Sequence, residues 1–342
     1  MSDGLPIHAP GALAGPEAIL SLGDLEWAVT SGAILPADVK LFVSEREVDP
    51  RTAGAAAGDR LSPLALRSFA HKGATLVFNN LQKLNPDFWE LACEVEGWLL
   101  DPVTIGAIAS FGGAGLKLHH DDAELIMLQL SGTKIWEFHG HAAGAPAEPW
   151  RITLTPGDLL FVPAGLRHRC EHEGFSLHLG LLVSHATPYH YLLYLARKAK
   201  EQGLLQSTLR RFQAPDVLAT DLASAGSAIR DLMGRYDIAA WLDESASAKA
   251  SLTALGLAPG SLDAPGAVAT LAVSMPPVRT TDGTLRAGPI TTGWSPAGAA
   301  LIAALQNGKM PVADLVRVTD PESGLAALEA LVAAGVIHVS AP

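Results

Sequence analysis

Short apolar runs, separated by Gly, Pro and Asp, fill the chain from Asp101 to about Ser184. They read TIGAIAS, LIMLQL, KIWEFHG, WRITLTPGD, LLFVPAG and FSLHLGLLVS. Short strands that recur about every 8–12 residues between turn residues are typical of an all-β sandwich or barrel. This region is therefore predicted to form a β-sandwich or barrel.

The pattern differs on both sides of this region. Residues 1–73 mix helical stretches with loop-like ones, 74–81 have the pattern of a strand, and 87–100 have helical spacing. After the strand-rich region come two segments with a helical pattern, 189–212 and 214–244. We expect these helices to pack together and against a second subunit.

The C-terminal part combines a hairpin with three helices. Residues 267–293 have the pattern of a β-hairpin with an Asp-Gly turn at Asp282. A helix cap at Ser295, with proline after it, opens a helix–helix–helix–strand order that is typical of a winged-helix-like module. The third helix carries Glu322 and Glu329 and no Lys or Arg. Because phosphate contacts need cations, we expect an interaction module rather than a DNA reader.

The composition is that of an ordinary soluble globular protein. With 24 Lys and Arg against 35 Asp and Glu, the 342 residues carry a formal net charge of −11. This balance argues against nucleic acid as a partner and suits a basic one. The N-terminus lacks the pattern of a signal peptide, and no segment approaches the roughly 18 apolar residues of a membrane span. Cys93 and Cys170 form no CxxC motif, so we expect a reduced, cytoplasmic setting.

Four titratable residues, His-His-Asp-Asp at 119–122, stand beside an apolar run. Unpaired charge in a core is costly, so this cluster is a candidate metal site. In a strand, residues i and i+2 share a face, so either His119 with Asp121 or His120 with Asp122 can chelate a metal. Alternation alone does not decide between the two pairs.

A second motif lies downstream. Gly157, Pro163, Gly165 and His168 follow the spacing G-x5-P-x-G-x2-H. A Gly-Asp turn, the buried strand LLFV and a Pro-Ala-Gly bend then place His168 at the start of the next strand, pointing inward. This spacing resembles the second motif of the cupin superfamily.

The upstream motif extends the resemblance. The pattern G-x3-H-x-D-x7-Q-x2-G-x-K-x-W resembles the cupin-type JmjC oxygenases, in the ribosomal-oxygenase group of the 2-oxoglutarate enzymes. The matching residues are Gly115, His119, Asp121, Gln129, Gly132, Lys134 and Trp136. Only the register that begins at His119 gives this spacing, so the resemblance implies that His120 and Asp122 point the other way. It covers about 75–185, and the later parts of the chain resemble the family more loosely.

The resemblance implies an α+β fold. A double-stranded β-helix, the cupin or JmjC jelly roll, would be followed by a helical dimerisation region and a winged-helix-like C-terminal module. We accordingly expect a catalytic domain with an N-terminal helical flank at 1–185. A helical region that forms a homodimer is expected at 186–245, and the hairpin with the winged-helix-like module at 246–342.

For the site, the resemblance implies that His119, Asp121 and His168 form a two-His, one-carboxylate triad. Such a triad holds Fe(II) on one face and leaves positions for 2-oxoglutarate and O2. Lys134 is assigned to the distal carboxylate of 2-oxoglutarate. The open alternative is a lysine at a hairpin exit whose amine reaches solvent.

Other positions near the site are less determined. Ser176 and His178 share a face of the strand after the second motif, so they either contact the co-substrate or are satisfied core groups. The strand before the metal motif departs from the family. Its polar residues are only Thr104 and Ser110, where family members often carry Asn, Tyr or Thr-Pro. The substrate is therefore not specified by this strand.

The resulting functional hypothesis is an Fe(II)- and 2-oxoglutarate-dependent hydroxylase of a protein or peptide side chain, with a basic ribosomal protein as the first candidate. One alternative is hydroxylation of a biosynthetic peptide or a free amino acid. Others are a metal cupin that needs no 2-oxoglutarate and a non-catalytic regulatory dimer. An intact triad together with Lys134 favours the oxygenase.

Overall fold

The chain folds into two compact units in a computed structural model. The structure describes residues 4–112, 116–140, 148–206, 214–253, 262, 264–280 and 282–340. The first unit comprises Met1–Val95 and Pro102–His185, and the second Glu96–Asp101 and Ala186–Pro342. Among the described residues no helix is both long and apolar enough to cross a membrane.

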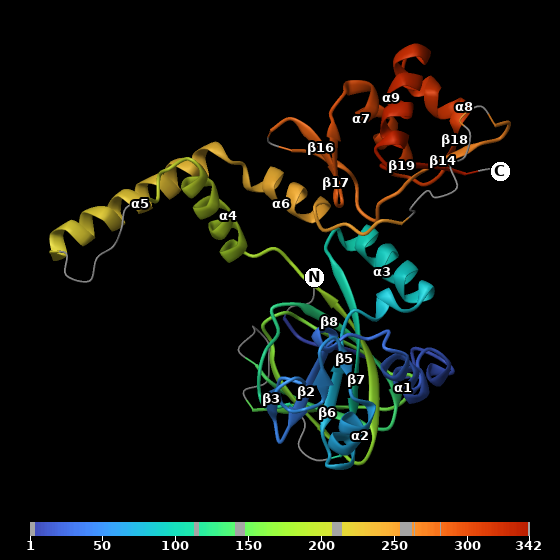
Figure 1. The fold of residues 1–342 in the computed structure, drawn as a ribbon, viewed down its shortest axis with the longest axis vertical. Helices are drawn as coiled ribbons and strands as arrows, with labels where there is room; N and C mark the ends of the chain where they lie inside the picture. The colour runs from blue at the N-terminus through green and yellow to red at the C-terminus, as the bar shows by residue number, and fades with distance from the viewer. Residues whose placement is uncertain are drawn as a thin grey trace. The chain divides into compact units, whose positions relative to one another are not determined.

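Two antiparallel sheets form the first unit (Figure 1). The large sheet has, in spatial order, β1 (Ile7–Ala9), β11 (Leu159–Val162), β8 (Glu124–Ser131), β13 (Ser176–Val183), β7 (Val103–Ser110), β6 (Thr75–Phe78), β2 (Val39–Val43) and β3 (Arg46–Val48). The small sheet has β10 (Trp150–Leu154), β9 (Lys134–His139) and β12 (Arg167–His172). A separate two-stranded ribbon pairs β4 (Ala56–Ala57) with β5 (Arg60–Leu61).

Strand alternation gives the first unit two apolar layers. On β7, Ile105, Ala107 and Ala109 face a core shared with helices α1 (Leu22–Ser31), α2 (Pro63–His71) and α3 (Pro86–Leu99). The opposite face of the large sheet meets the small sheet across a second core. The buried members of that core are Leu125, Met127, Trp136, Phe138, Leu154, Leu160, Val162, Leu166 and Cys170. This is the predicted cupin jelly roll, with an inner cavity between its sheets.

The strands expected from the sequence are confirmed, but the N-terminal part needs a correction. Residues 1–73 were expected to hold helices and loops, whereas β1, β2 and β3 lie there and extend the large sheet at its two edges. The β2–β3 turn explains the difference. Its central residues, Ser44 and Glu45, have φ of 49° and 64°, in the left-handed region where Gly or Asn is usual.

The second unit begins with three helices, α4 (Pro188–Glu201), α5 (Pro215–Arg235) and α6 (Ile238–Ser247). They share an aromatic cluster in which Tyr191 and Tyr194 pack against Trp241, and the Tyr191 hydroxyl donates to the Tyr236 carbonyl oxygen. The expected helix at 189–212 ends at Glu201 in the structure, and its last residues, from 207, lie outside the described part of the chain.

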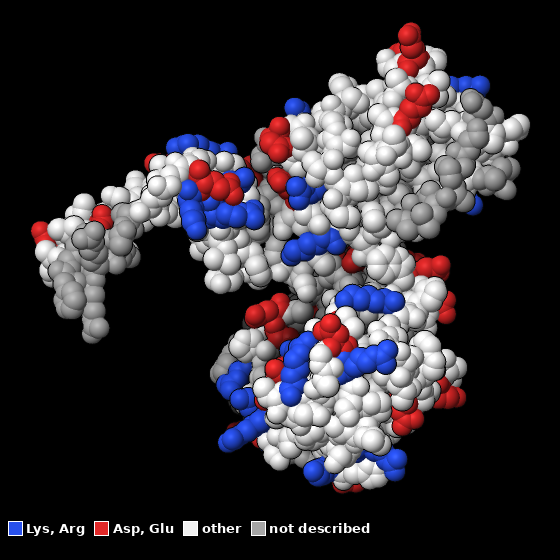
Figure 2. Space-filling view, in the orientation of Figure 1, with Lys and Arg blue, Asp and Glu red and all other residues white. Residues whose placement is uncertain are grey.

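The C-terminal elements close around a third core. The hairpin predicted at 267–293 is confirmed about its Asp282 turn, where β15 (Val278–Arg279) pairs with β16 (Thr284–Ala287), but residues 268–271 at its expected start belong to another sheet. The third strand of the β15–β16 sheet is β17 (Ile290–Gly293). A second sheet, with β18 (Met310–Pro311), β14 (Val268–Leu271) and β19 (Ile337–Ser340), packs with α7 (Pro296–Leu305), α8 (Val312–Leu315) and α9 (Pro321–Ala333). Figure 2 shows acidic side chains over the region of α9, as the sequence of that helix predicts.

Candidate active site

His119, Asp121 and His168 are held together by backbone pairing. His168 is the second residue of β12, and His119 forms an isolated antiparallel bridge with it. His119 N–H donates to the His168 oxygen at 3.0 Å, and His168 N–H donates to the His119 oxygen at 2.8 Å. The Pro-Ala-Gly bend adds a bond, because Gly165 N–H donates to the Asp121 backbone oxygen at 2.8 Å. The two sequence motifs are thus fixed directly to each other.

The side chains of these three residues converge. One ligand atom from each lies within 4.8 Å of the others, and Asp121 Oδ2 is 3.7 Å from His119 Nε2 and 3.5 Å from His168 Nε2. The Nδ1 atoms of His119 and His168 lie 2.8 Å and 2.9 Å from the backbone oxygens of Lys117 and Leu166. With Nδ1–H donating there, each Nε2 presents its lone pair to the shared space. This donor set fits a divalent metal ion with open positions.

Electrostatics favour the same protonation state. Burial lowers the pKa of His168, so its imidazole is neutral and available as a ligand.

The neighbouring pair, His120 and Asp122, is placed differently. The His120 and Asp122 side chains are 56% and 95% exposed, and their closest charged atoms are 4.0 Å apart. The structure therefore brings the pair that begins at His119 to His168 and leaves the other pair in solvent.

Lys134 opens β9 and lies inside the unit. The residue is only 2% exposed, which excludes the reading in which its amine reaches solvent. Its Nζ donates to Ser110 Oγ at 2.8 Å, and Ser110 also accepts from Thr75 Oγ1 at 3.2 Å. Burial lowers the pKa of Lys134. Among the described residues it has no carboxylate partner.

A cavity of about 710 Å³ joins the triad and Lys134. Its inner wall is formed by His119, Asp121, His168, Lys134, Trp136, Cys170 and His178. Its outer wall includes Lys40, Phe42, Glu45, Arg46 and Glu47 from β2, β3 and their turn. The sequence pattern did not predict this outer wall. The alternation in VKLFV was the available signal, but the turn after it lacks the glycine or asparagine that marks a hairpin.

Ser176 and His178 have different positions despite sharing a strand. Ser176 is fully buried and accepts a hydrogen bond from Gln129 Nε2 at 3.0 Å, and it does not lie on the cavity wall. His178 lies on that wall, and neither of its ring nitrogens has a hydrogen-bond partner among the described residues. Ser176 is therefore a satisfied core residue, hydrogen bonded to Gln129, whereas the ring of His178 is available to bind a ligand in the cavity.

The remaining motif residues shape the turn before Lys134. Gln129 Nε2 donates to the backbone oxygens of Ser131 and Gly132, at 2.8 Å and 3.2 Å. Gly132 has a φ of 67°, and a Cβ there would lie 2.0 Å from the Phe175 backbone oxygen. Only glycine fits this turn, so the Gln-x2-Gly-x-Lys spacing fixes where Lys134 enters the sheet. Gly115, the first residue of the motif, lies outside the described residues.

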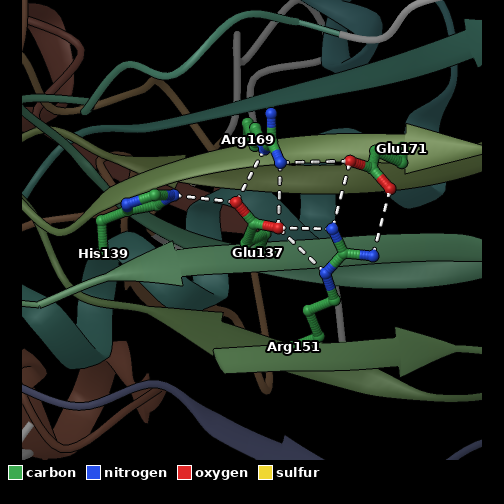
Figure 3. Close-up of polar contacts among 5 residues, drawn as sticks. All are labelled: Glu137, His139, Arg151, Arg169 and Glu171. Carbon is green, nitrogen blue, oxygen red and sulfur yellow. Dashed lines mark hydrogen bonds and ion pairs between the residues drawn. The ribbon is translucent and has the colours of Figure 1, made fainter. Parts of the chain in front are cut away.

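Ion pairs hold the outer face of the sheet that carries Lys134 and His168 (Figure 3). Glu137, at the centre, accepts from Arg151 Nη2 at 2.6 Å, Arg169 Nη2 at 3.0 Å and His139 Nε2 at 2.9 Å. Hydrogen bonds from Arg169, then from Arg151 and His139, lower the pKa of Glu137 to about 2 although burial opposes them. The network ties β9, β10 and β12 together behind the site.

Comparison with known proteins identifies the fold family. A JmjC domain model matches residues 78–190. Ribosomal oxygenase 2 of Mus musculus is 28% identical over 182 residues, which are 48% of this chain and 38% of that protein. The chain thus spans well under half of the length of this curated relative.

Solved structures agree with the sequence match. The Escherichia coli ribosomal oxygenase YcfD in complex with cobalt and succinic acid aligns with a TM-score of 0.60 and 17% identity, over 98% of this chain and 95% of that one. The same protein with cobalt and 2-oxoglutarate aligns with a TM-score of 0.56 and 18% identity, over 99% and 96%. At this identity the similarity establishes the fold. The crystallised ligands show that a structure of this fold accommodates a metal with a dicarboxylate.

Proposed function

Residues 78–190 belong to the JmjC domain family and the chain is ribosomal-oxygenase-like; on this premise we propose that it is an Fe(II)- and 2-oxoglutarate-dependent oxygenase. His119, Asp121 and His168 would hold the iron. Bound iron supplies the activation of O2, with 2-oxoglutarate as the source of electrons. The chain's own residues bind, orient and shield the reactants.

The burial of Lys134 without a carboxylate partner among the described residues is the observation that supports this proposal most directly. A buried cation is costly unless an anion compensates it, and its only hydrogen bond among the described residues goes to the Ser110 hydroxyl. The amine lies in the same cavity as the triad, so a ligand that spans both needs a metal-binding end and a distal carboxylate. 2-Oxoglutarate has a metal-binding keto acid end and a distal carboxylate. A metal cupin that does not bind this co-substrate would have no anion to compensate the buried Lys134.

We place the substrate at the outer wall of the cavity. The names of the relatives point to ribosomal proteins, and a protein or peptide side chain is the substrate we propose, with hydroxylation as the reaction. Phe42 offers an apolar surface at this wall, and Glu45, Arg46 and Glu47 offer charges of both signs. Glu45 and Glu47 suit a basic segment of the substrate.

Replacement of Lys134 tests the functional class. We expect Lys134→Ala to weaken apparent 2-oxoglutarate affinity about ten- to hundredfold, because a charge-assisted contact worth roughly 1.5–3 kcal/mol is lost. Lys134→Arg keeps the charge and should be milder, and Lys134→Glu should be the worst because it sets two anions together. The measurement is anaerobic titration of the Fe(II) protein with 2-oxoglutarate, followed by the weak visible charge-transfer band.

The control is Lys72→Ala, at an exposed position after α2, which should titrate like the parent. Iron content should be the same in all variants, because Lys134 is not a metal ligand. Unchanged half-saturation in Lys134→Ala and Lys134→Glu would remove Lys134 from the co-substrate site. The metal cupin would then be the better description.

A further inference from the structure

Two more buried basic side chains lie close to Lys134: His178 lines the cavity with it, whereas His172 is its neighbour in the sheet and is not part of the cavity lining. His172 lies directly opposite Lys134 in the β9–β12 ladder, on the face of β12 that also carries His168 and Cys170. His178 reaches the same region from β13. Lys134, His172 and His178 are 2%, 8% and 1% exposed, so three basic side chains from three strands are buried together.

The ring nitrogens of the two histidines distinguish them from ordinary core residues. Neither ring nitrogen of His172 or of His178 is hydrogen bonded within the described part of the chain. Buried polar groups are almost always satisfied in native proteins, so four unsatisfied nitrogens in one place call for a ligand or ordered solvent. A histidine that merely filled the core would have been satisfied by a backbone carbonyl or a hydroxyl.

The charges that act on the two histidines are positive. The charged or titratable neighbours that act on the histidines are Lys134 and, for His178, also His172. Uncharged polar groups on the packed strands include the hydroxyl of Ser110 on β7 and the amide of Gln129 on β8, and Cys170 on β12 is a buried thiol. Asp121 lies in the same cavity and acts on Cys170, but no carboxylate among the described residues acts on His172 or His178. Their immediate surroundings are therefore complementary to an anion.

We propose that His172 and His178 form, with Lys134 and Ser110, the pocket for the distal carboxylate, and that the two histidines take up one proton from solvent when it enters. This inference rests on the proposed function, because 2-oxoglutarate is the ligand that delivers the carboxylate. It adds two binding residues to Lys134 and makes co-substrate binding dependent on pH.

The direction of the pH dependence follows from the charges. Burial and, next, the Lys134 charge lower the pKa of His172 to about 4, and the same causes hold the pKa of His178 well below its usual value. Without ligand both are therefore neutral near pH 7. An incoming carboxylate stabilises the imidazolium form and raises the pKa of the pair. Affinity for the dicarboxylate should then be high at low pH and fall as pH rises through the raised pKa.

Calorimetry on the anaerobic Fe(II) form of the whole 342-residue chain tests this. 2-Oxoglutarate is titrated in two buffers of different ionisation enthalpy, which gives the number of protons taken up on binding. The comparison ligand is 2-oxobutyrate, which has the same keto acid group and no distal carboxylate. We expect uptake approaching one proton with 2-oxoglutarate and none with 2-oxobutyrate. In the proton-linked range the affinity for 2-oxoglutarate should fall by up to about tenfold per pH unit.

The variants are His172→Asn and His178→Asn, with His71→Asn on the exposed end of α2 as the matched control. Each pocket variant should bind 2-oxoglutarate roughly three- to tenfold more weakly, the effect of losing one hydrogen bond. Proton uptake should fall in both variants, while iron content and 2-oxobutyrate affinity stay at the parent value. The control should match the parent in every measurement.

These measurements distinguish a failure of the proposed function from a failure of the histidine pocket. If the parent does not bind 2-oxoglutarate at all, the proposed function itself is wrong. If it binds with no proton uptake, or takes up equal amounts with 2-oxobutyrate, the histidine pocket is wrong and the proposed function stands. Full uptake in both asparagine variants would place the proton on Lys134 and overturn the inference, and this result does not depend on how well either variant folds.

Discussion

Backbone pairing with His168 and side-chain exposure separate the two candidate pairs at 119–122. Alternation failed there because the segment is not a strand: His119 forms an isolated bridge, and the residues after it have no regular pairing. A period of two therefore does not apply. What the sequence did specify was the distance to Gln129, Gly132 and Lys134, and the physical reason for that spacing is the Gly132 turn.

Alanine replacements in both pairs test the metal assignment. We expect His119→Ala, Asp121→Ala and His168→Ala to lose most bound iron, since removing one of three protein ligands leaves too few to hold it. The matched controls, His120→Ala and Asp122→Ala, change exposed side chains and should keep full iron content. Metal analysis after Fe(II) loading and gel filtration measures this. An empty site in the controls and a full one in the first set would reverse the assignment.

At the scale of elements, strand prediction succeeded where turns carry Gly, Pro or Asp. The strands from β7 to β13 follow such turns, and their apolar runs are buried on one or both faces. The hairpin of β2 and β3 was missed because Ser44 and Glu45 adopt left-handed conformations that their residue types do not signal. Tertiary packing on the sheet edge, which no local pattern encodes, selects that turn.

The Glu137 network gives a prediction about the small sheet. Glu137→Gln should lower the free energy of unfolding by about 1–2 kcal/mol at pH 7, because it removes the charge that two partly exposed arginines share. The pKa of Glu137 is lowered from 4.5 to about 2 in the fold. Its contribution is therefore fully present above pH 4.5 and is lost as pH falls toward 2.

Urea unfolding of parent and variant at several pH values measures this difference. The gap between Glu137→Gln and the parent should narrow as pH falls below about 4.5, the usual pKa of the carboxyl group. Glu171→Gln is the matched control on the same face, since its contacts with Arg151 and Arg169 are longer, at 3.4 Å, and its side chain is 43% exposed. A gap that is constant with pH, or equally large in the control, would mean that the charge of Glu137 adds nothing.

At the scale of the whole molecule, the helices α4 and α5 of the second unit expose large apolar side chains. Leu192 and Leu193 on α4 are 48% and 50% exposed, and Leu222 on α5 is 61% exposed. Their neighbours Tyr191 and Leu195 are buried in the aromatic cluster, so each helix has an apolar side beyond the one that its own unit covers. Apolar side chains exposed along two neighbouring helices are typical of a protein–protein interface.

We therefore expect self-association through α4 and α5. Sedimentation at micromolar concentration should show a dimer for the parent and a monomer for the double variant Leu192→Glu, Leu193→Glu, because two charges would be buried unpaired in the interface. The control is Leu64→Glu on α2, where the side chain is 78% exposed in the other unit and the dimer should persist. Circular dichroism should be unchanged in both, which separates lost assembly from lost folding. A monomeric parent, or a double variant that still dimerises, would show that these helices have another role.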